Sequence, residues 1–85
     1  MYYVYILKSL KDGDFYTGYT EYVKVRINDH GLGKVESTKH RRPLQLICYE
    51  AYLDKDTAMA REAFLKTSDG KREINRRLKK YRGLN

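Results

Sequence analysis

Four polar or ionisable side chains near the start of the chain have spacings that could bring them into one patch. Tyr5 and Tyr16 stand eleven residues apart, and Arg26 and His30 follow, four residues apart. Residues four apart share a face of a helix, so the arginine and the histidine would point the same way. A small protein that gathers such groups is suited to holding or cutting a charged substrate.

Cleavage of a phosphodiester needs a nucleophilic water, a base, a cation to orient the phosphate and a Lewis acid to bear developing charge. The planar fork of Arg26 suits a phosphate. Tyr5, Tyr16 and His30 are candidates for base, for positioning the water or for contact with the leaving group. An unperturbed tyrosine is a poor base near neutral pH, so nearby positive charge would have to lower its pKa.

A carboxylate further along the chain could supply the Lewis acid. Glu62 shares a predicted helix face with Ala58 and Leu65, where an unpaired charge is costly. One acidic side chain can suffice for Mg²⁺, because this ion keeps most of its waters and accepts phosphate oxygens as further ligands. We therefore expect Glu62 to hold a divalent metal, Mg²⁺ with Mn²⁺ as a substitute.

Each of these residues also has an ordinary structural interpretation. Tyrosines in strands are usually half-buried packing residues. Arg26 could be solvated or paired with Asp29 or Glu21, and His30 could favour the C-terminal end of a helix. Glu62 could be a partly buried partner of Arg26 or Arg61. It is their joint occurrence that favours a site.

Two strands and a turn are predicted to position the tyrosines. Residues 2–8 are apolar on both faces and β-rich, which predicts a buried strand. Asp12-Gly13 is typical of a hairpin turn, and residues 15–20 read as the returning strand. Gly18 within that strand indicates a close approach of another group.

The length of the hairpin loop decides whether the tyrosines meet. An even loop puts both on one sheet face, for example with Tyr16 opposite Ser9 and Tyr5 opposite Thr20. An odd loop would separate them.

The remaining pattern completes one small domain, residues 1–85, with a core over about 2–68 and a basic helix or tail over 70–85. A helix is predicted over 21–31, with Thr20 or Glu21 near its start and Gly31 or Gly33 at its end. A basic loop over 32–43 leads to a doubly apolar strand over 44–53, expected in the middle of the sheet. A second helix, capped by Asp54 or Asp56, runs to about Thr67. The predicted class is α+β: a small central antiparallel three-stranded sheet flanked by helices, in the order β-β-α-β-α-(α).

The charge balance favours a polyanionic partner. Lysine and arginine total 18 against 11 acidic residues, a net charge of +7 on 85 residues. Nucleic acid is the first expectation and an anionic membrane surface the second. No apolar run approaches the roughly 18 residues of a membrane span, and the single Cys48 fits a reducing compartment. We expect a cytoplasmic protein without a membrane partner or an obligate protein partner, as a monomer or a weak dimer through an exposed sheet edge.

The tyrosine segments carry a family resemblance. Tyr3-Val4-Tyr5 and Tyr16-Thr17-Gly18 resemble the signature strands of the GIY-YIG nuclease superfamily, although Tyr3 and Thr17 depart from the named letters. Arg26 ten residues after Tyr16, then His30, and Glu62 in REAFLK agree with that family. The N-terminal YVYILKS and the block STKHRRPLQL at 37–46 resemble its small stand-alone bacterial branch. The resemblance covers about residues 2–68.

This resemblance implies roles for the residues above. Tyr5 and Tyr16 would be the paired active-site tyrosines, Arg26 the phosphate-stabilising arginine, His30 a supporting residue and Glu62 the ligand of one divalent metal. The basic loop would line a nucleic-acid groove on the ground of its charge. Candidate nucleic-acid contacts are Tyr19, which stands where several members have a lysine, the loop residues Lys39, Arg41 and Arg42, and Asn75, the best-placed asparagine near the final helix.

Three functions remain open from the sequence. The first is a metal-dependent endonuclease, with DNA favoured over RNA. The second is a non-catalytic nucleic-acid-binding module on the same scaffold, supported by the charge and by strand aromatics that could stack bases. The third is a regulatory domain with a relict site, in which the basic segment from Lys71 to Arg82 anchors an acidic partner.

Overall fold

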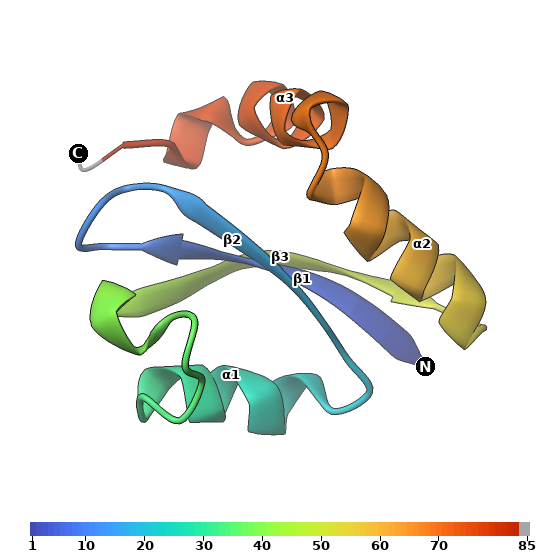
Figure 1. Ribbon diagram of the computed structural model, residues 1–85, viewed down its shortest axis with the longest axis horizontal. Coiled ribbons are helices and arrows are strands. Elements are labelled where there is room, and N and C mark those ends of the chain that lie inside the picture. The colour runs from blue at the N-terminus through green and yellow to red at the C-terminus, as the bar shows by residue number, and fades with distance from the viewer. Residues whose placement is uncertain (84–85) are drawn as a thin grey trace.

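Three antiparallel strands form the middle layer of the fold, with helices on both faces (Figure 1). The computed structural model describes residues 1–83. The elements are β1 (Tyr2–Ser9), β2 (Phe15–Thr20), α1 (Val23–Gly31), the short 3₁₀ turn η1 (Lys39–Arg41), β3 (Leu44–Tyr52), α2 (Lys55–Leu65), α3 (Ser68–Arg77) and a second 3₁₀ turn, η2 (Lys79–Tyr81). The predicted α+β class and element order are confirmed.

The middle strand of the sheet is β1, in the order β2-β1-β3. The expectation that the strand at 44–53 lies in the middle is therefore wrong. Strand β1 is buried from Val4 onward, whereas β3 exposes 41% of Leu46 and 52% of Tyr49. Both strands are apolar in sequence, so apolar content alone did not separate a central strand from an edge strand whose outer side chains remain in water.

The hairpin pairing puts both tyrosines on one face, as an even loop requires. Tyr5 lies opposite Gly18, and Leu7 lies opposite Tyr16. Cross-strand partners share a sheet face, and so do residues two apart, so Tyr5 and Tyr16 are diagonal neighbours.

The individual pairs predicted for the hairpin, with Tyr16 opposite Ser9 and Tyr5 opposite Thr20, are wrong by two positions. The turn is centred one residue earlier in the chain, between Lys11 and Asp12, than that pairing assumed. The Ser9 amide donates to the Asp14 carbonyl at 2.9 Å, and the Ser9 hydroxyl accepts the amide of Asp12 at 3.1 Å. Gly13 has a φ of 76°, a conformation that glycine adopts without steric cost. These bonds close the loop sooner and shift the register by two residues.

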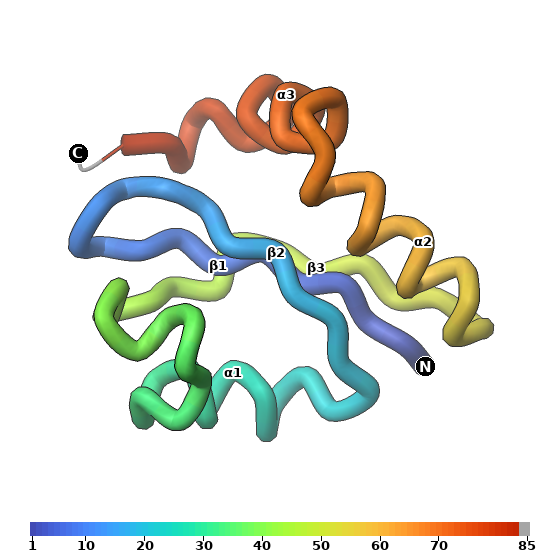
Figure 2. Tube along the Cα trace, in the orientation of Figure 1, coloured from blue at the N-terminus to red at the C-terminus, as the bar shows by residue number. Residues whose placement is uncertain are grey.

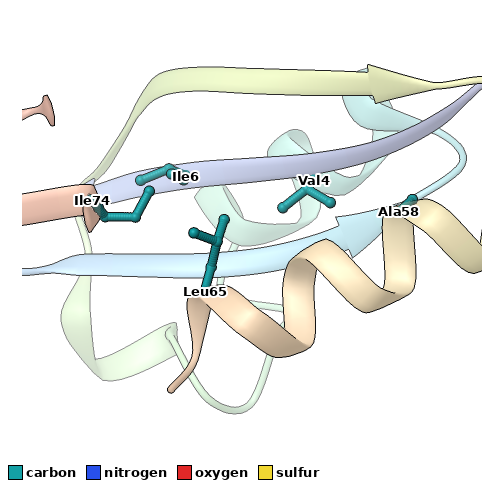
Figure 3. Packing of buried hydrophobic residues seen from close by; sticks show 5 residues of the cluster. All are labelled: Val4, Ile6, Ala58, Leu65 and Ile74. Atoms are coloured by element: carbon teal, nitrogen blue, oxygen red, sulfur yellow. The ribbon is translucent and has the colours of Figure 1, made fainter. Parts of the chain in front are cut away.

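The apolar core lies on the sheet face covered by α2 and α3. Its buried cluster comprises Val4 and Ile6 from β1, Ala58 and Leu65 from α2, and Ile74 from α3 (Figure 3). Each is at most 5% exposed. Because α3 contributes Ile74, the packed core extends beyond residue 68.

The helix ends follow capping chemistry in α2 and depart from it in α1. Asp54 accepts the Thr57 amide at 2.8 Å, which is the predicted cap. Helix α1 starts later than predicted: Tyr22 occupies the N-cap position without a side-chain bond, while Thr20 accepts the Tyr22 amide at 3.0 Å. Gly33, at a φ of 76°, follows the last turn of α1, as predicted for its end.

The C-terminal segment returns to the β1–β2 hairpin (Figure 2). The Gly83 amide donates to the Gly13 carbonyl at 3.1 Å, and Arg82 pairs with Asp14 at 3.1 Å. Residues 70–83 of the expected basic C-terminal segment are thus helical in α3 and then contact the hairpin, while residues 84 and 85 lie outside the described residues. Within residues 1–83, none of the helices has the length and apolar character needed to cross a membrane.

Candidate active site

The Tyr5 ring lies across the backbone of the edge strand β2. A methyl group at Gly18 would overlap the Cζ and Oη atoms of Tyr5. The glycine therefore makes room for the phenol, which is the close approach that the sequence predicted at this position. Tyr5 is only 1% exposed, yet its hydroxyl reaches the edge of the sheet, between β2 and α1.

Two α1 side chains meet the Tyr5 hydroxyl. His30 Nε2 lies 2.7 Å from Tyr5 Oη, and Arg26 Nε donates to the same oxygen at 3.4 Å. The four-residue spacing puts both on one side of α1, facing the sheet. The structure thus brings three of the predicted site residues into a single hydrogen-bonded group.

His30 is held between both tyrosine rings. Its ring centroid lies 5.4 Å from that of Tyr5 and 5.3 Å from that of Tyr16, each in an edge-to-face arrangement. Its other nitrogen, Nδ1, lies 2.7 Å from Thr38 Oγ1. Both His30 and Thr38 are at most 1% exposed, so this chain of hydrogen bonds is shielded from water.

Thr38 is the site residue that sequence reasoning missed. It fixes His30 by a buried hydrogen bond, although it lies in the loop before η1 rather than on a regular element. The available signal was its place in the block at 37–46. We interpreted that block through its basic side chains and not through its hydroxyls.

Tyr16 completes this face from the start of β2. Its hydroxyl accepts a hydrogen bond from Ser37 Oγ at 3.3 Å, and its ring centroid lies 6.5 Å from that of Tyr5. The Tyr5 hydroxyl is engaged in the interior, whereas the Ser37–Tyr16 contact is exposed. The two phenols are therefore near one another but in different environments.

Burial and charge set the protonation states of the group. The pKa of His30 is lowered to about 4, mainly by burial and also by the Arg26 charge, while Asp29 opposes this. The imidazole is therefore neutral near pH 7. Burial is also the main cause that raises the pKa of Tyr5, against the lowering effect of its hydrogen bond with Arg26. The free protein thus holds a neutral tyrosine beside a neutral histidine.

Glu62 lies in the opposite layer, on α2. Its described partner is Lys66, at 3.2 Å, and no direct contact joins it to either predicted tyrosine. Its charge nevertheless contributes to raising the pKa of Tyr5, which lies on the other face of the sheet, and of Tyr19. The structure brings Glu62 within electrostatic range of the hydroxyl group but not into its hydrogen-bonded cluster.

Tyr19 belongs to the face of Glu62, not to that of Tyr5. It pairs with Val4 across the strands and packs against the apolar core. Its hydroxyl oxygen is buried, and among residues 1–83 it has no hydrogen-bond partner. Burial is the main cause that raises its pKa.

The predicted nucleic-acid contacts in the basic loop are engaged with the protein itself. Lys39 pairs with Glu36 at 3.1 Å, and Arg41 binds both carboxylate oxygens of Asp12, at 2.9 and 3.2 Å. Arg42 Nε donates to the Lys39 carbonyl at 2.9 Å. The Arg41–Asp12 pair braces η1 against the hairpin, whereas the Lys39 and Arg42 contacts stay within the loop. Their charges still face solvent in part, which keeps them available to a polyanion.

Asn75, the last predicted contact, is exposed on α3. It lines a cleft of about 340 Å³ between β2, the end of α2, α3 and Arg82. That cleft also lies apart from the hydroxyl cluster, on the sheet face of the apolar core.

Comparisons with known proteins agree on one family. A family model described as the GIY-YIG catalytic domain matches residues 1–79. The chain is 48% identical over 66 residues to a UPF0213 protein of Staphylococcus haemolyticus, covering 76% of this chain and 79% of that protein. It is 40% identical over 73 residues to one of Staphylococcus saprophyticus, covering 85% and 88%.

A further UPF0213 protein, from Streptococcus agalactiae, is 45% identical over 65 residues, covering 75% of this chain and 73% of that protein. No solved structure matches the chain significantly. The resemblance found in the tyrosine motifs is confirmed by these matches. The printed names of the relatives state no activity, so the roles of individual residues rest on the geometry above.

Proposed function

The chain belongs to the GIY-YIG nuclease superfamily, and from that premise we propose that it is a metal-dependent endonuclease that hydrolyses phosphodiester bonds in DNA. One observation carries the proposal. The Tyr5 hydroxyl is held between the guanidinium of Arg26, at 3.4 Å, and a neutral His30, at 2.7 Å. In that arrangement the Tyr5 hydroxyl carries a proton, His30 can accept one, and the adjacent Arg26 can bind a phosphate.

Arg26 is the proposed phosphate ligand. It donates to the Tyr5 hydroxyl, which lies over Gly18, where the edge strand has no side chain. A phosphodiester at this edge would accept hydrogen bonds from those N–H groups of Arg26 that do not contact Tyr5. The charge of the phosphate would then lie against the one cation of the cluster.

The proposed base is Tyr5, assisted by His30. The attacking water would give a proton to Tyr5 Oη as Tyr5 passes its own proton to His30 Nε2, while Thr38 accepts the Nδ1–H and fixes the tautomer. The water oxygen would bond to phosphorus, and the bond from phosphorus to the leaving oxygen would break. Tyr16, with its exposed hydroxyl, would protonate that oxygen.

Substrate binding would prepare this transfer electrostatically. The positive charge of Arg26 is one cause of the low pKa of His30. A bound phosphate would offset that charge, so the histidine would accept a proton more readily with substrate present. The resting protein would stay in the neutral state until the phosphate arrives.

Glu62 is the proposed metal ligand. Residues 1–83 contain no cluster of three or more histidine, cysteine, aspartate or glutamate side chains that could hold an ion. A single carboxylate fits an ion that retains waters and takes substrate oxygens, as Mg²⁺ does and Mn²⁺ can. The buried, unpartnered hydroxyl of Tyr19 offers such a water a hydrogen bond on the same face. When bound, the ion would stabilise negative charge on the phosphoryl oxygens.

DNA is the proposed substrate: the net charge of +7 suits a polyanion, and the family assignment supports a nucleic acid, of which we favour DNA. We place the protein in the cytoplasm, acting as a monomer or a weak dimer and without an obligate protein partner.

Cleavage of labelled single-stranded, duplex and branched DNA in Mg²⁺ or Mn²⁺ would test the proposal. We expect Tyr5→Phe, Arg26→Gln and Glu62→Gln each to lower the rate by about 10²–10⁴-fold, the range for loss of a general acid or base. Tyr49→Phe is the matched control, since that tyrosine is exposed on β3. Full activity of Glu62→Gln, or no cleavage of any substrate, would contradict the proposal.

A non-catalytic nucleic-acid-binding module is the second candidate. It is favoured by the separation between Glu62, whose described partner is Lys66, and the hydroxyl cluster on the opposite face. Metal-independent binding with a steep salt dependence, without cleavage in Mg²⁺ or Mn²⁺, would select it.

A further inference from the structure

A second hollow, which we name the β2–α3 cleft, lies on the sheet face opposite the hydroxyl cluster. It is formed where the start of β2 meets the end of α2, α3 and the returning C-terminal segment. Its volume of about 340 Å³ is at the small end of ligand pockets. The side chains that matter for its chemistry are Phe15, Lys66, Lys71, Asn75, Arg82 and Asp14.

The β2–α3 cleft carries a positive balance. Lys66, Lys71 and Arg82 line it against one carboxylate, Asp14, which is neutralised by Arg82 at 3.1 Å. No carboxylate of residues 1–83 forms an ion pair with Lys71. Lys71 and Asn75 are four apart on α3 and therefore share a face. Together they offer a cation and an amide to one ligand, a combination that suits a phosphate group and a base edge.

The same hollow contains flat and apolar surface. The Arg82 guanidinium lies over the Phe15 ring, 5.7 Å from its centroid. Nucleobases stack on arginine planes and on aromatic rings. Leu65 and Ile74 form part of the lining as well. A ligand with a planar ring and an attached phosphate would match both parts of the surface.

The position of the β2–α3 cleft relates it to the scissile site. Gly18, where the Tyr5 hydroxyl lies, and Tyr16, which borders the cleft, are two residues apart along β2. Two residues of a strand span roughly 7 Å, about one nucleotide step of an extended chain. Lys66 provides a second link, because it lines the cleft and pairs with Glu62 at 3.2 Å.

We propose that the β2–α3 cleft binds the nucleotide next to the scissile phosphate, with its phosphate at Lys71 and its base against Arg82 and Phe15. This inference rests on the proposed nuclease function. A hollow of about 340 Å³ admits a single nucleotide and not a base pair within a duplex. The proposal therefore defines the substrate class: DNA that is unpaired at the nucleotide beside the cut.

Binding without metal tests the cleft separately from catalysis. Fluorescence anisotropy would follow a labelled single-stranded 12-mer and the matching blunt duplex, in EDTA, with the full chain. Lys71→Glu is the test variant, and its exposure favours normal folding. Arg76→Glu is the matched control, because it changes the net charge equally from an exposed position of α3 outside the cleft.

We expect Lys71→Glu to weaken single-strand binding about tenfold and duplex binding less than twofold, with Arg76→Glu changing either by less than twofold. The salt dependence of single-strand binding should also fall by about 0.7 in slope for the lost phosphate. Equal losses in both variants, or equal losses on both DNA forms, would overturn the inference.

The two proposals can fail separately. If the wild type cleaves DNA and Lys71→Glu binds single strands as tightly as the wild type, the nuclease proposal stands and the cleft proposal is contradicted. If Lys71→Glu selectively loses single-strand binding but the wild type cleaves no DNA, the cleft proposal stands and the nuclease proposal is contradicted.

Discussion

The two faces of the small sheet are built on opposite principles. The face under α2 and α3 is filled by Val4, Ile6 and Leu65, which are buried and make no hydrogen bonds through their side chains. The face under α1 buries Tyr5 and His30, which are nearly as inaccessible but bonded to one another. One strand, β1, supplies residues to both faces in alternation.

This contrast separates what holds the fold from what could do chemistry. Apolar burial on the α2 and α3 face stabilises by removing surface from water and needs no particular orientation. The α1 face gains little from burying polar groups, which must find partners merely to offset desolvation. The polar interior of so small a domain is therefore better explained by the proposed site than by stability.

The largest expected effect concerns the apolar face. Leu65→Ala should lower the free energy of unfolding by about 2–5 kcal/mol, because the shortened side chain would leave a cavity in a tightly packed cluster. Tyr5→Phe, on the polar face, should cost about 1–3 kcal/mol, since it leaves buried His30 without one partner. Urea unfolding followed by circular dichroism would compare them. A larger loss of stability in Tyr5→Phe than in Leu65→Ala would contradict the claim that the apolar face contributes more to stability than the polar face.

A smaller effect is expected at the strand that both tyrosines share. Gly18→Ala should cost about 1–3 kcal/mol by overpacking against the Tyr5 ring. Gly31→Ala is the matched control, because a methyl group there meets no atom within 4 Å. Thermal unfolding would measure both, and combining Gly18→Ala with Tyr5→Leu should recover part of the loss. Equal behaviour of the two glycines would show that the phenol does not occupy the space over β2.

The last effect depends on pH. His30 has a folded pKa of about 4, below its ordinary value of 6.5, so the unfolded chain binds its proton first as the pH falls. This contribution to stability is present above pH 6.5 and is lost between about 6.5 and 4. His30→Gln should flatten that part of the stability profile.

Exposed His40 on η1 is the control for that experiment. Urea midpoints at a series of pH values for His30→Gln, His40→Gln and the wild type would sharpen the comparison. If the stability of His30→Gln depends on pH with the same slope as that of the wild type, the polar face does not hold a neutral histidine.

Much of the fold was predictable because local patterns and tertiary structure agree. The Asp12-Gly13 turn, the Asp54 cap and the even parity of the hairpin each follow from short-range chemistry. The place of β3 at the edge was not predictable from its composition. That place depends on which strand the helices cover, a tertiary property that an apolar run does not encode.

The candidate site stays a prediction as a set of residues, and sequence spacing accounts for only part of its geometry. The α1 spacing gave the common direction of Arg26 and His30, and the strand alternation brought Tyr5 and Tyr16 to one face. The hydroxyl of Thr38 escaped notice because loops have no period from which a direction can be inferred. The layer that contains Glu62 was not predictable for a related reason. Helix spacing fixes the face of α2 on which Glu62 lies, but not the side of the sheet on which α2 packs.

The hydrogen bond from Gly83 to the hairpin has a practical consequence for handling the protein. Gly83 is held at the hairpin and Arg82 lines the β2–α3 cleft, so an affinity tag at the C-terminal end would follow closely on residues that border the cleft. The N-terminus lies at the far end of the sheet (Figure 1). Purification handles should be attached there, so that oligonucleotide access is not obstructed by the added chain.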